Sequence, residues 1–417
     1  MRRKIIEAGI VAVCLLGIGG MTASGQENNI SSVCGQFAEG MTPSTGKVNL
    51  KVFAVSFPDM EFEGETLSAG ELQQALFDGS REGSMTAFEK TSSYGALQVE
   101  GQVRYYEAQH DNAYYQSLEN GYEALAEEVL SYFDDEIDYT ECDSDGNGYI
   151  DAFTLNIAGQ DNYWYGCQAT WWEDTDFAVD GVKPYNYIIN DAQPYQENME
   201  YYVSEMCHEF GHCMGLPDLY LYDTDDYEGM TGIAGTEMME DMTGDYSMFS
   251  KLMLGWLQQK QVKVYGGGSR NYRLASAEKT GGCIVIPRTT GDNTFTGEYF
   301  LIQYDTPDGN LKNVLTDEDA GVRIFHIDAE VASDEYSETS FFRYNGFSEY
   351  YDKSHEGIRI IRLVNDESGY FKAGDTVDAG RLLWYDGDGK ETVDSGITIQ
   401  IKNSSAKNKI QIEISRK

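Results

Sequence analysis

Two histidines four residues apart, with a glutamate directly after the first, are the residues in this sequence best suited to chemistry. They lie in the run CHEFGHCMGLPD, which covers residues 207–218. On a helix, side chains at positions i and i+4 project from one face, so the imidazoles of His208 and His212 can reach one Zn²⁺. Glu209 would then lie beside the open coordination position, where a carboxylate can serve as a general base. The spacing therefore predicts a catalytic zinc site.

A catalytic zinc site has three protein ligands and one water, so the third ligand must come from outside this helix. Gly215 follows His212 by three residues and allows a sharp turn, which can return Asp218 to the metal. The alternative is a site whose third ligand is a glutamate on a later helix, with Glu237 or Glu240 as the candidate. Asp218 is the interpretation that we adopt.

This ligand set predicts the hydrolysis of peptide bonds. Zn²⁺ polarises the scissile carbonyl and lowers the pKa of its bound water. Glu209 can take a proton from that water and later pass it to the leaving amine. Because water attacks directly, no serine or cysteine nucleophile is required. The predicted function is that of a zinc-dependent endopeptidase acting on protein substrates.

A second metal-binding pattern covers residues 143–151, with the sequence DSDGNGYID. Side chains with oxygen ligands stand at loop positions 1, 3, 5 and 9, and these are Asp143, Asp145, Asn147 and Asp151. Gly148 at the sixth position allows the turn of a Ca²⁺-binding loop. Position 12 is Thr154 instead of the usual bidentate glutamate, so we expect no complete helix-loop-helix hand. The pattern favours a structural Ca²⁺ site, and a polar turn is the alternative.

The elements that position these residues follow from hydrophobic periodicity. Residues 47–57 and 149–158 alternate or concentrate apolar side chains as strands do. A spacing of three and four predicts an amphipathic helix near residues 116–133. The zinc motif lies on a helix expected over 196–214, which the following Gly and Pro end. Another helix is expected over 247–257.

Beyond residue 258 the sequence changes to short alternating runs separated by Gly, Asp and Asn. These runs predict strands at 321–327, 357–364, 397–401 and 410–414. We therefore predict an α+β chain. A polar segment at 26–46 leads into a domain at 47–258 that combines strands and helices and carries the zinc motif. A β-rich C-terminal domain follows at 259–417, and no low-complexity linker separates the two.

The N-terminus and the overall charge restrict where the protein acts and what it binds. Residues 1–25 have the basic start, apolar run and small-residue end of a signal peptide, so we expect export into the extracellular space. No later run of about 18 apolar residues could span a membrane. The 417 residues have a formal net charge of -40, which repels phosphate backbones and argues against nucleic acid as a partner. Proteins, peptides and glycoproteins remain as partners.

Several separated segments resemble the immune inhibitor A family of secreted metalloproteases, which belongs to the metzincin-like zinc peptidases. The segments are 51–59 (KVFAVSFPD), 92–101 (SSYGALQVEG), 143–151 (DSDGNGYID), 207–220 (CHEFGHCMGLPDLY), 244–256 (GDYSMFSKLMLGW) and 370–376 (YFKAGDT). The resemblance implies a secreted zinc endopeptidase from a bacterium. It also implies that residues 47–258 form a metzincin-like zinc peptidase domain, a mixed sheet with active-site and backing helices. Metzincins also place a methionine in a turn beneath the zinc ligands, a role that the resemblance gives to Met239, with Met238 as the alternative. Asp241 stands where some metzincins carry a tyrosine, so no such tyrosine is assigned.

A second hypothesis comes from another class of protein. The chain could be an exported Ca²⁺-dependent adhesion or glycan-binding protein with an inactive zinc site. Trp171, Trp172 and the β-rich C-terminal half would supply its binding face. The two tryptophans belong to an aromatic cluster with Tyr163, Trp164 and Tyr165 that could line a substrate- or sugar-binding wall. Packing in a core is the alternative for these rings. The intact Glu209 argues against this hypothesis, because a structural zinc site has no use for a base.

The remaining cysteines and histidines give weaker signals. Six cysteines follow the predicted signal peptide and permit disulfides, but their irregular spacing indicates no pairing. A free thiol or a disulfide is the expected state of Cys34, and a thiolate that blocks the zinc is the alternative. His326 and His355 have no second histidine at ligand spacing, so we expect both to be packed or surface residues.

Overall fold

The computed structural model describes residues 29–62, 67–159, 167–172, 175–190, 199–220, 233, 237–292, 294–333, 339–344, 358–365, 369–403 and 408–417. The predicted signal peptide lies outside the described residues, as do Tyr163, Trp164, Tyr165 and His355. The described chain combines helices with several sheets, consistent with the predicted α+β class. None of its helices is long and apolar enough to cross a membrane.

The first half of the chain forms a mixed five-stranded sheet. Its strands are β1 (Gly46–Ser56), β2 (Leu97–Glu107), β3 (Phe153–Ile157), β4 (Gln168–Trp171) and β5 (Asn186–Asn190), arranged in the order β2-β1-β3-β5-β4. β2, β1, β3 and β5 are parallel to their neighbours, whereas β4 runs antiparallel to β5 at one edge. The strand predicted at 47–57 is confirmed as β1. The strand predicted at 149–158 is shorter and begins at Phe153.

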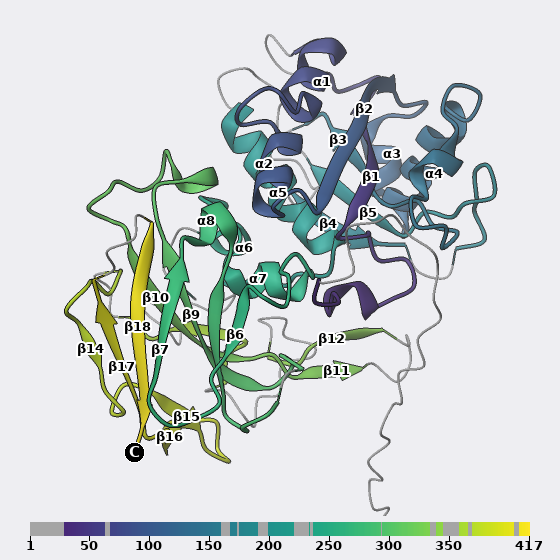
Figure 1. Cartoon of the computed structure of the whole chain (residues 1–417). Helices are drawn as coiled ribbons and strands as arrows, with labels where there is room; N and C mark the ends of the chain where they lie inside the picture. Colours follow the sequence, from purple (N-terminus) through teal and green to yellow (C-terminus); the bar gives the residue numbers. More distant parts are fainter. Residues whose placement is uncertain are drawn as a thin grey trace, which may run out of the picture.

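Helices cover both faces of this sheet (Figure 1). Val48, Leu50 and Val52 of β1 pack in one hydrophobic cluster with α1 (Ala69–Phe77), α2 (Met85–Ser92) and α5 (Met199–Cys213). Phe53 and Val55 pack in another cluster with α3 (Asn112–Gln116) and α4 (Gly121–Tyr132). Because side chains alternate between the two faces of a strand, β1 contributes to both clusters.

The helix predicted over 116–133 is correct in type but wrong at its start. α3 ends at Gln116, and α4 begins only at Gly121. The intervening chain doubles back so closely that a Cβ on Gly121 would lie 2.1 Å from the carbonyl oxygen of Tyr115. A continuous hydrophobic spacing therefore covers two helices joined by a tight turn.

The second half of the chain is β-rich, as its alternating sequence predicts, and its two largest sheets form a sandwich. One sheet has the order β13-β10-β9-β8-β6, with the strands β6 (Val262–Val264), β8 (Cys283–Pro287), β9 (Glu298–Asp305), β10 (Gly321–Asp328) and β13 (Ile361–Leu363). The other has the order β14-β17-β18-β7, with β7 (Arg270–Ala275), β14 (Thr376–Val377), β17 (Ile397–Lys402) and β18 (Lys409–Arg416). Ile302 and Ile324 of the first sheet share a core with Ile399 and Ile412 of the second.

The sheet that contains β9 is buried on both faces. Its alternate residues Val285, Leu301 and Phe325 belong to the same hydrophobic cluster as β1 and α5. Three short helices lie between the two halves (Figure 1), namely α6 (Met238–Asp241), α7 (Met248–Met253) and α8 (Ala277–Thr280). α7 is the helix predicted over 247–257, in a shorter form. The two halves therefore share one hydrophobic core.

Residues 29–44 fasten the beginning of the described chain to the junction of the two halves. The Val33 amide donates to the Met253 carbonyl at 2.8 Å, and the Trp256 indole donates to the Ser44 carbonyl at 2.6 Å. A hairpin of β11 (Val331–Ser333) and β12 (Ser340–Phe342) reaches the same place, where the Ser340 amide donates to the Phe37 carbonyl at 2.8 Å. Segments distant in sequence thus meet beneath α5.

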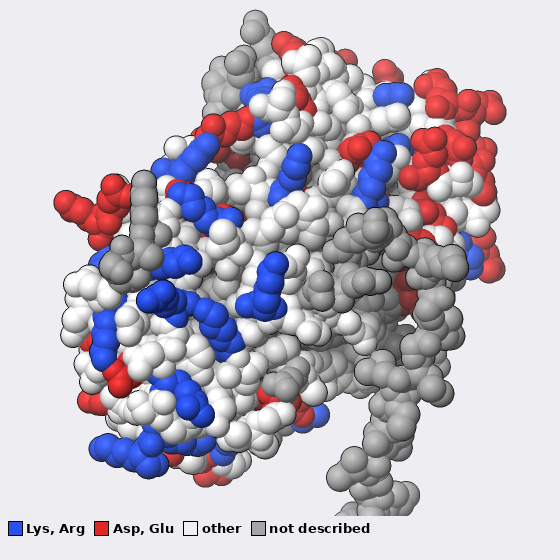
Figure 2. All heavy atoms as spheres, in the orientation of Figure 1, with Lys and Arg blue, Asp and Glu red and all other residues white. Residues whose placement is uncertain are grey.

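The charges of the chain are divided unevenly between its halves. Residues 259–417 contain 20 of the 30 Lys and Arg residues but only 25 of the 70 Asp and Glu residues. Figure 2 shows this division. Basic side chains are spread over the C-terminal sandwich, and acidic side chains gather at the edge of the first half that is remote from the sandwich. Most of the negative charge therefore belongs to the half that carries the zinc motif.

Candidate metal centre

The zinc motif occupies the last two turns of α5, which is buried on nearly all sides. Met206 and Phe210 belong to the hydrophobic cluster that anchors the helix. Gly211, between the two histidines, faces a methionine of α6. A Cβ at Gly211 would lie 2.6 Å from the Sδ atom of Met239. Gly211 therefore allows Met239 to pack directly against the helix at the level of the two imidazoles.

Three ligand atoms converge at the end of this helix. The Nε2 atoms of His208 and His212 lie 3.2 Å apart, and Asp218 Oδ1 lies 3.0 Å from the first and 3.2 Å from the second. Among the described residues, these three form the one group of three or more His, Cys, Asp or Glu side chains that could share a metal ion. Zinc bonds of about 2.0–2.1 Å at tetrahedral angles separate the ligand atoms by roughly 3.3 Å. The triangle therefore has the dimensions that zinc requires.

The hydrogen bonds behind the histidines also fit a metal. His208 Nδ1 lies 2.7 Å from the Met238 carbonyl oxygen, and His212 Nδ1 lies 2.7 Å from the Leu216 carbonyl oxygen. A carbonyl only accepts, so each Nδ1 carries the hydrogen and each neutral imidazole directs the lone pair of Nε2 toward Asp218. Three acceptor atoms then face one another with no hydrogen between them. A metal ion at the centre would satisfy all three atoms, and without a metal a proton on one histidine Nε2 can bridge them.

The electrostatics of the cluster favour positive charge. Burial alone would raise the pKa of Asp218, but the adjacent His212 and His208 outweigh burial and hold that pKa well below its usual range. Burial alone would lower the pKa of His212, but Asp218 and Glu209 raise it to about 9. Without a metal, the site therefore attracts a proton.

The turn after α5 returns Asp218 to the histidines. Gly215 has a φ of +94°, a left-handed conformation that favours glycine. Its missing side chain also leaves room for the N-terminal segment, because a Cβ there would lie 2.9 Å from the Cβ of Cys34. The amide of Leu219 then donates to the Met239 carbonyl at 2.8 Å. This bond fixes the segment that carries Asp218.

Glu209 lies between α5 and the edge strand β4. Its Oε2 atom accepts a hydrogen bond of 2.5 Å from the backbone amide of Ala169, and the residue is 7% exposed. The carboxylate is therefore oriented by a strand that lies forty residues earlier in the chain. Local sequence holds no signal for this contact, which sequence reasoning missed.

The alternative ligands Glu237 and Glu240 have other partners. Glu237 accepts hydrogen bonds from the Ser247 amide at 2.8 Å and from the Ser250 hydroxyl at 2.7 Å. Glu240 accepts from the Ile233 amide at 2.9 Å. Neither belongs to the group of ligand atoms. Both instead support the loop that holds α6.

The two candidate methionines of α6 make different contacts. Met239 places its sulfur against Gly211, between the two histidines in sequence; the turn-methionine role that the family resemblance gives to Met239 stays a prediction. Met238 contributes its carbonyl oxygen to His208. The role of this carbonyl was not predicted, because every residue type carries the same main-chain oxygen.

In the predicted Ca²⁺ loop, aspartate carboxylates accept hydrogen bonds from backbone amides of the same loop. Asp143 accepts hydrogen bonds of 2.9 Å from the amides of Asn147 and Gly148, and Asp151 accepts a bond of 3.1 Å from the Ser144 amide. Asp143, Asp145 and Asp151 do not form a metal-sized group among the described residues. These bonds are those of a polar turn, and Ca²⁺ binding stays a prediction.

All six described cysteines are free. Cys34 is buried behind Gly215, and burial raises the pKa of its thiol far above the usual value. It does not belong to the group of ligand atoms. The described residues therefore place this thiol against the turn and not at the zinc ligands.

The other singled-out side chains lie as follows. His326 is buried in the C-terminal sandwich between Glu298 and Glu391, at 2.9 and 2.6 Å, so the expectation of a packed residue is confirmed. Trp172 stacks on Phe177, and both rings are partly buried against the hydrophobic cluster of the first half that contains Phe53 and Val55. Trp171, in contrast, is 40% exposed near the candidate metal centre.

Comparisons with known proteins add little to this geometry. No known family model matches the chain, and no curated protein matches it. Among solved structures, two crystal forms of wild-type OgpA from Akkermansia muciniphila are similar, each at 13% sequence identity, with TM-scores of 0.28 and 0.26. The matches cover 77% of this chain and 96% and 95% of theirs. Likeness at this level carries no argument about function.

Proposed function

We propose that this protein is an exported zinc-dependent endopeptidase that hydrolyses peptide bonds of protein substrates. The observation that carries the proposal is the convergence of three lone-pair atoms, from His208, His212 and Asp218, beside the buried carboxylate of Glu209. A structural zinc site is closed by four protein ligands, whereas a site with three leaves a position for water or substrate. The proposed resident metal is therefore catalytic.

The side chains around the metal have distinct tasks. When bound, Zn²⁺ would polarise the scissile carbonyl and acidify a water molecule. Glu209 would take the proton of the attacking water and deliver it to the leaving amine. The Ala169 amide holds the Glu209 carboxylate in place at 2.5 Å. The Met238 and Leu216 carbonyls hold the histidine rings in the tautomer that binds metal.

The edge of β4 provides a place for an extended substrate. Trp172, directly after β4, donates its amide to the Tyr185 carbonyl at 2.9 Å, whereas the Ala169 amide points the opposite way, toward Glu209. Among the described strands, β4 pairs with β5 alone. An extended peptide that added to its other edge would pass directly beside the Glu209 carboxylate. This geometry suits an endopeptidase better than an enzyme for small molecules.

The adhesion hypothesis explains less of the geometry. It accounts for the exposed ring of Trp171, but it gives no role to Glu209 or to an open metal position. Export and Ca²⁺ binding are compatible with both hypotheses, whereas a catalytic zinc belongs to the endopeptidase proposal. The site itself therefore favours hydrolysis.

One experiment separates the two functions. The protein without residues 1–25 is purified, its metal content is measured by mass spectrometry, and cleavage of casein is assayed before and after chelation. We expect about one zinc per chain, cleavage that chelation abolishes, and recovery when zinc returns. A folded chain that binds no zinc, or that cleaves equally well in chelator, would contradict the proposal.

A further inference from the structure

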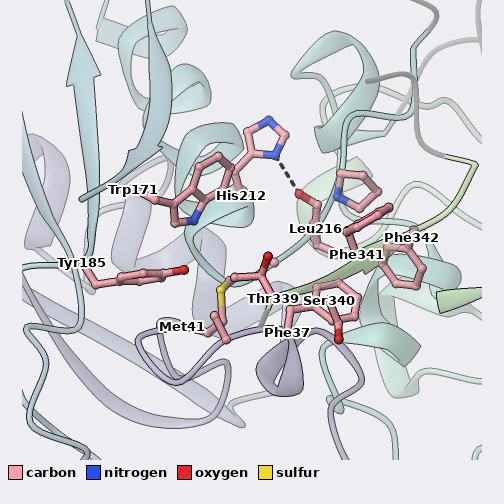
Figure 3. Close-up of a pocket in the computed structure, with 13 residues that line it drawn as sticks. Phe37, Met41, Trp171, Tyr185, His212, Leu216, Thr339, Ser340, Phe341 and Phe342 are labelled. Atoms are coloured by element: carbon pink, nitrogen blue, oxygen red, sulfur yellow. Dashed lines mark hydrogen bonds between the residues drawn. The ribbon is translucent and has the colours of Figure 1, made fainter. Parts of the chain in front are cut away.

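A cavity of about 190 Å³ opens next to His212 (Figure 3). Four separate parts of the chain line it: the N-terminal segment, the end of β4 with Tyr185, the turn after α5, and β12 with the residue before it. The lining residues are Phe37, Ala38, Met41, Trp171, Tyr185, His212, Gly215, Leu216, Pro217, Thr339, Ser340, Phe341 and Phe342. In Figure 3 the rings of Trp171 and Tyr185 lie on one side of the cavity, opposite Leu216 and the two phenylalanines of β12.

We propose that this cavity is the specificity pocket of the enzyme and receives a large apolar side chain of the substrate near the cleaved bond. The inference rests on the proposed endopeptidase function and names its substrate class. It also gives the C-terminal half a direct role, because Phe341 and Phe342 of β12 form one wall. The peptidase half alone would have an incomplete pocket.

The size and the chemistry of the cavity fit such a side chain. An apolar cavity of about 150 Å³ in a protein can hold a benzene ring. A cavity of about 190 Å³ therefore admits the side chain of leucine, methionine or phenylalanine. Aromatic and aliphatic residues dominate its lining, and the described lining residues include no Lys, Arg, Asp or Glu. A charged side chain would lose its hydration there without gaining a partner.

The position of the cavity relative to the reacting groups supports the same assignment. Ala169 contacts Glu209, and Trp171, two residues further along β4, lines the cavity. Strands advance about 3.3 Å per residue, so this separation corresponds to roughly 7 Å. A peptide paired with β4 would thus place a side chain over the cavity within two residues of the bond beside Glu209.

The walls of the cavity are held mainly by contacts between the lining residues themselves. The rings of Phe37 and Phe342 meet edge to face at 5.0 Å, and the Ser340 amide bonds to the Phe37 carbonyl. The Tyr185 ring fills the space where Gly40 lacks a side chain, because a Cβ there would lie 2.4 Å from that ring. The pocket therefore exists before substrate arrives, and preformed pockets bind with little ordering cost.

Ala38 offers a matched pair of variants. Ala38→Phe adds a ring at the lining, whereas Ala38→Ser leaves the volume nearly unchanged. Cleavage of a peptide library is read by mass spectrometry, and kcat/KM is then measured for two peptides that differ only by leucine or alanine at the selected position. We expect wild type and Ala38→Ser to prefer leucine by about tenfold or more. Ala38→Phe should reduce this ratio to near one.

A second variant and a binding measurement keep the inference testable without turnover. Phe341→Ala removes part of the wall from the C-terminal half and should also lower the preference for leucine. The same two peptides are titrated into zinc-loaded Glu209→Gln protein, with the fluorescence of Trp171 as the signal and Trp171→Phe as its control. We expect the leucine peptide to bind about tenfold more tightly, and addition of Ala38→Phe to remove the difference.

The outcomes distinguish the two proposals. Cleavage with no apolar preference, or with a preference that Ala38→Phe leaves unchanged, would overturn the pocket but not the endopeptidase. A zinc-loaded protein that cleaves no peptide but binds leucine selectively through this cavity would support the pocket and refute the endopeptidase. A properly folded Ala38→Phe protein with unchanged zinc content is the condition for each comparison.

Discussion

Replacement of Asp218 by asparagine tests the assignment of the metal ligands most directly. Asp218→Asn keeps the shape and the Oδ1 atom of the side chain but removes its charge. Asp218 Oδ1 lies 3.0 and 3.2 Å from the two histidine nitrogens, and the residue is buried. The variant therefore changes the charge at the centre of the site and little else.

The size of the effect follows from the attraction that the site has for a proton. The pKa of His212 rises from 6.5 to about 9, although burial opposes the rise. This difference corresponds to roughly 3 kcal/mol in favour of a single positive charge, supplied mostly by Asp218 and Glu209. Zinc has twice that charge. Asp218 supplies only part of this preference, but it would also bind the metal directly. Because loss of a partner behind a ligand already costs about 10–100-fold in metal affinity, we expect Asp218→Asn to weaken zinc binding by about 100-fold or more, or roughly 3 kcal/mol.

The assay is competition between the protein and a chromophoric zinc chelator, with stoichiometry measured by mass spectrometry. Glu240→Gln is the matched control, because Glu240 is a buried carboxylate that bonds to the Ile233 amide and does not reach the ligand atoms. We expect this control to bind zinc as wild type does. Wild-type affinity in Asp218→Asn, or a large loss in Glu240→Gln, would refute the ligand assignment.

Further predictions concern the base, the turn, the acidic loop and a buried histidine. Glu209→Gln should retain zinc and lower kcat by roughly 10²–10⁴-fold; near-normal turnover of the loaded variant would exclude the general-base role. Gly215→Ala should lower the free energy of unfolding by more than about 1–2 kcal/mol, measured in urea, because φ is +94° and the new Cβ collides with Cys34. Addition of Ca²⁺ to chelator-treated protein should raise the melting temperature of wild type but not of Asp145→Asn, and equal responses would leave residues 143–151 as a polar turn. Burial lowers the pKa of His326, but two carboxylates outweigh burial and raise it, so its charge stabilises the fold fully below about pH 6.5 and less as pH rises through the higher folded value. The stability difference between wild type and His326→Gln in urea should therefore shrink from pH 6 to pH 9, and a constant difference would contradict this reasoning.

Much of the candidate site could be predicted because its signals are local. His208, Glu209 and His212 lie within five residues on one helix, and helical geometry alone brings the two imidazoles together. The turn at Gly215 required only the knowledge that glycine tolerates a left-handed backbone. Asp218 was within reach of that turn. For these residues, spacing along the chain determines placement in space.

The rest of the site depends on partners that are distant in sequence. The Ala169 amide that holds Glu209 and the Met238 carbonyl that holds His208 are main-chain groups, so no residue type marks them. The cavity beside His212 combines Phe37, Trp171 and Phe341, which meet only after the whole chain has folded. Such contacts leave no local periodic pattern.

The fold shows the same division. The alternating runs after residue 258 predicted a β-rich half, and the structure places a sandwich there. The helix near 116–133 was misjudged because hydrophobic spacing continues across the turn between α3 and α4. Periodicity identifies buried faces, but it does not register a reversal of direction between two helices with similar faces.

The attachment of residues 29–44 has a consequence for the order in which the molecule assembles during synthesis. Ser32 bonds to the Met253 carbonyl 221 residues later, so at about 5–20 residues per second the first folded segment waits roughly 10 to 45 s for its partner. Leu301 and Phe325, which complete the shared core, emerge later still. A nascent chain should therefore stay sensitive to protease, and without activity, until the C-terminal sandwich has left the ribosome, which pulse proteolysis of stalled chains would measure. Because the shared core is completed this late, a chain that is still on the ribosome would not yet cleave the proteins around it.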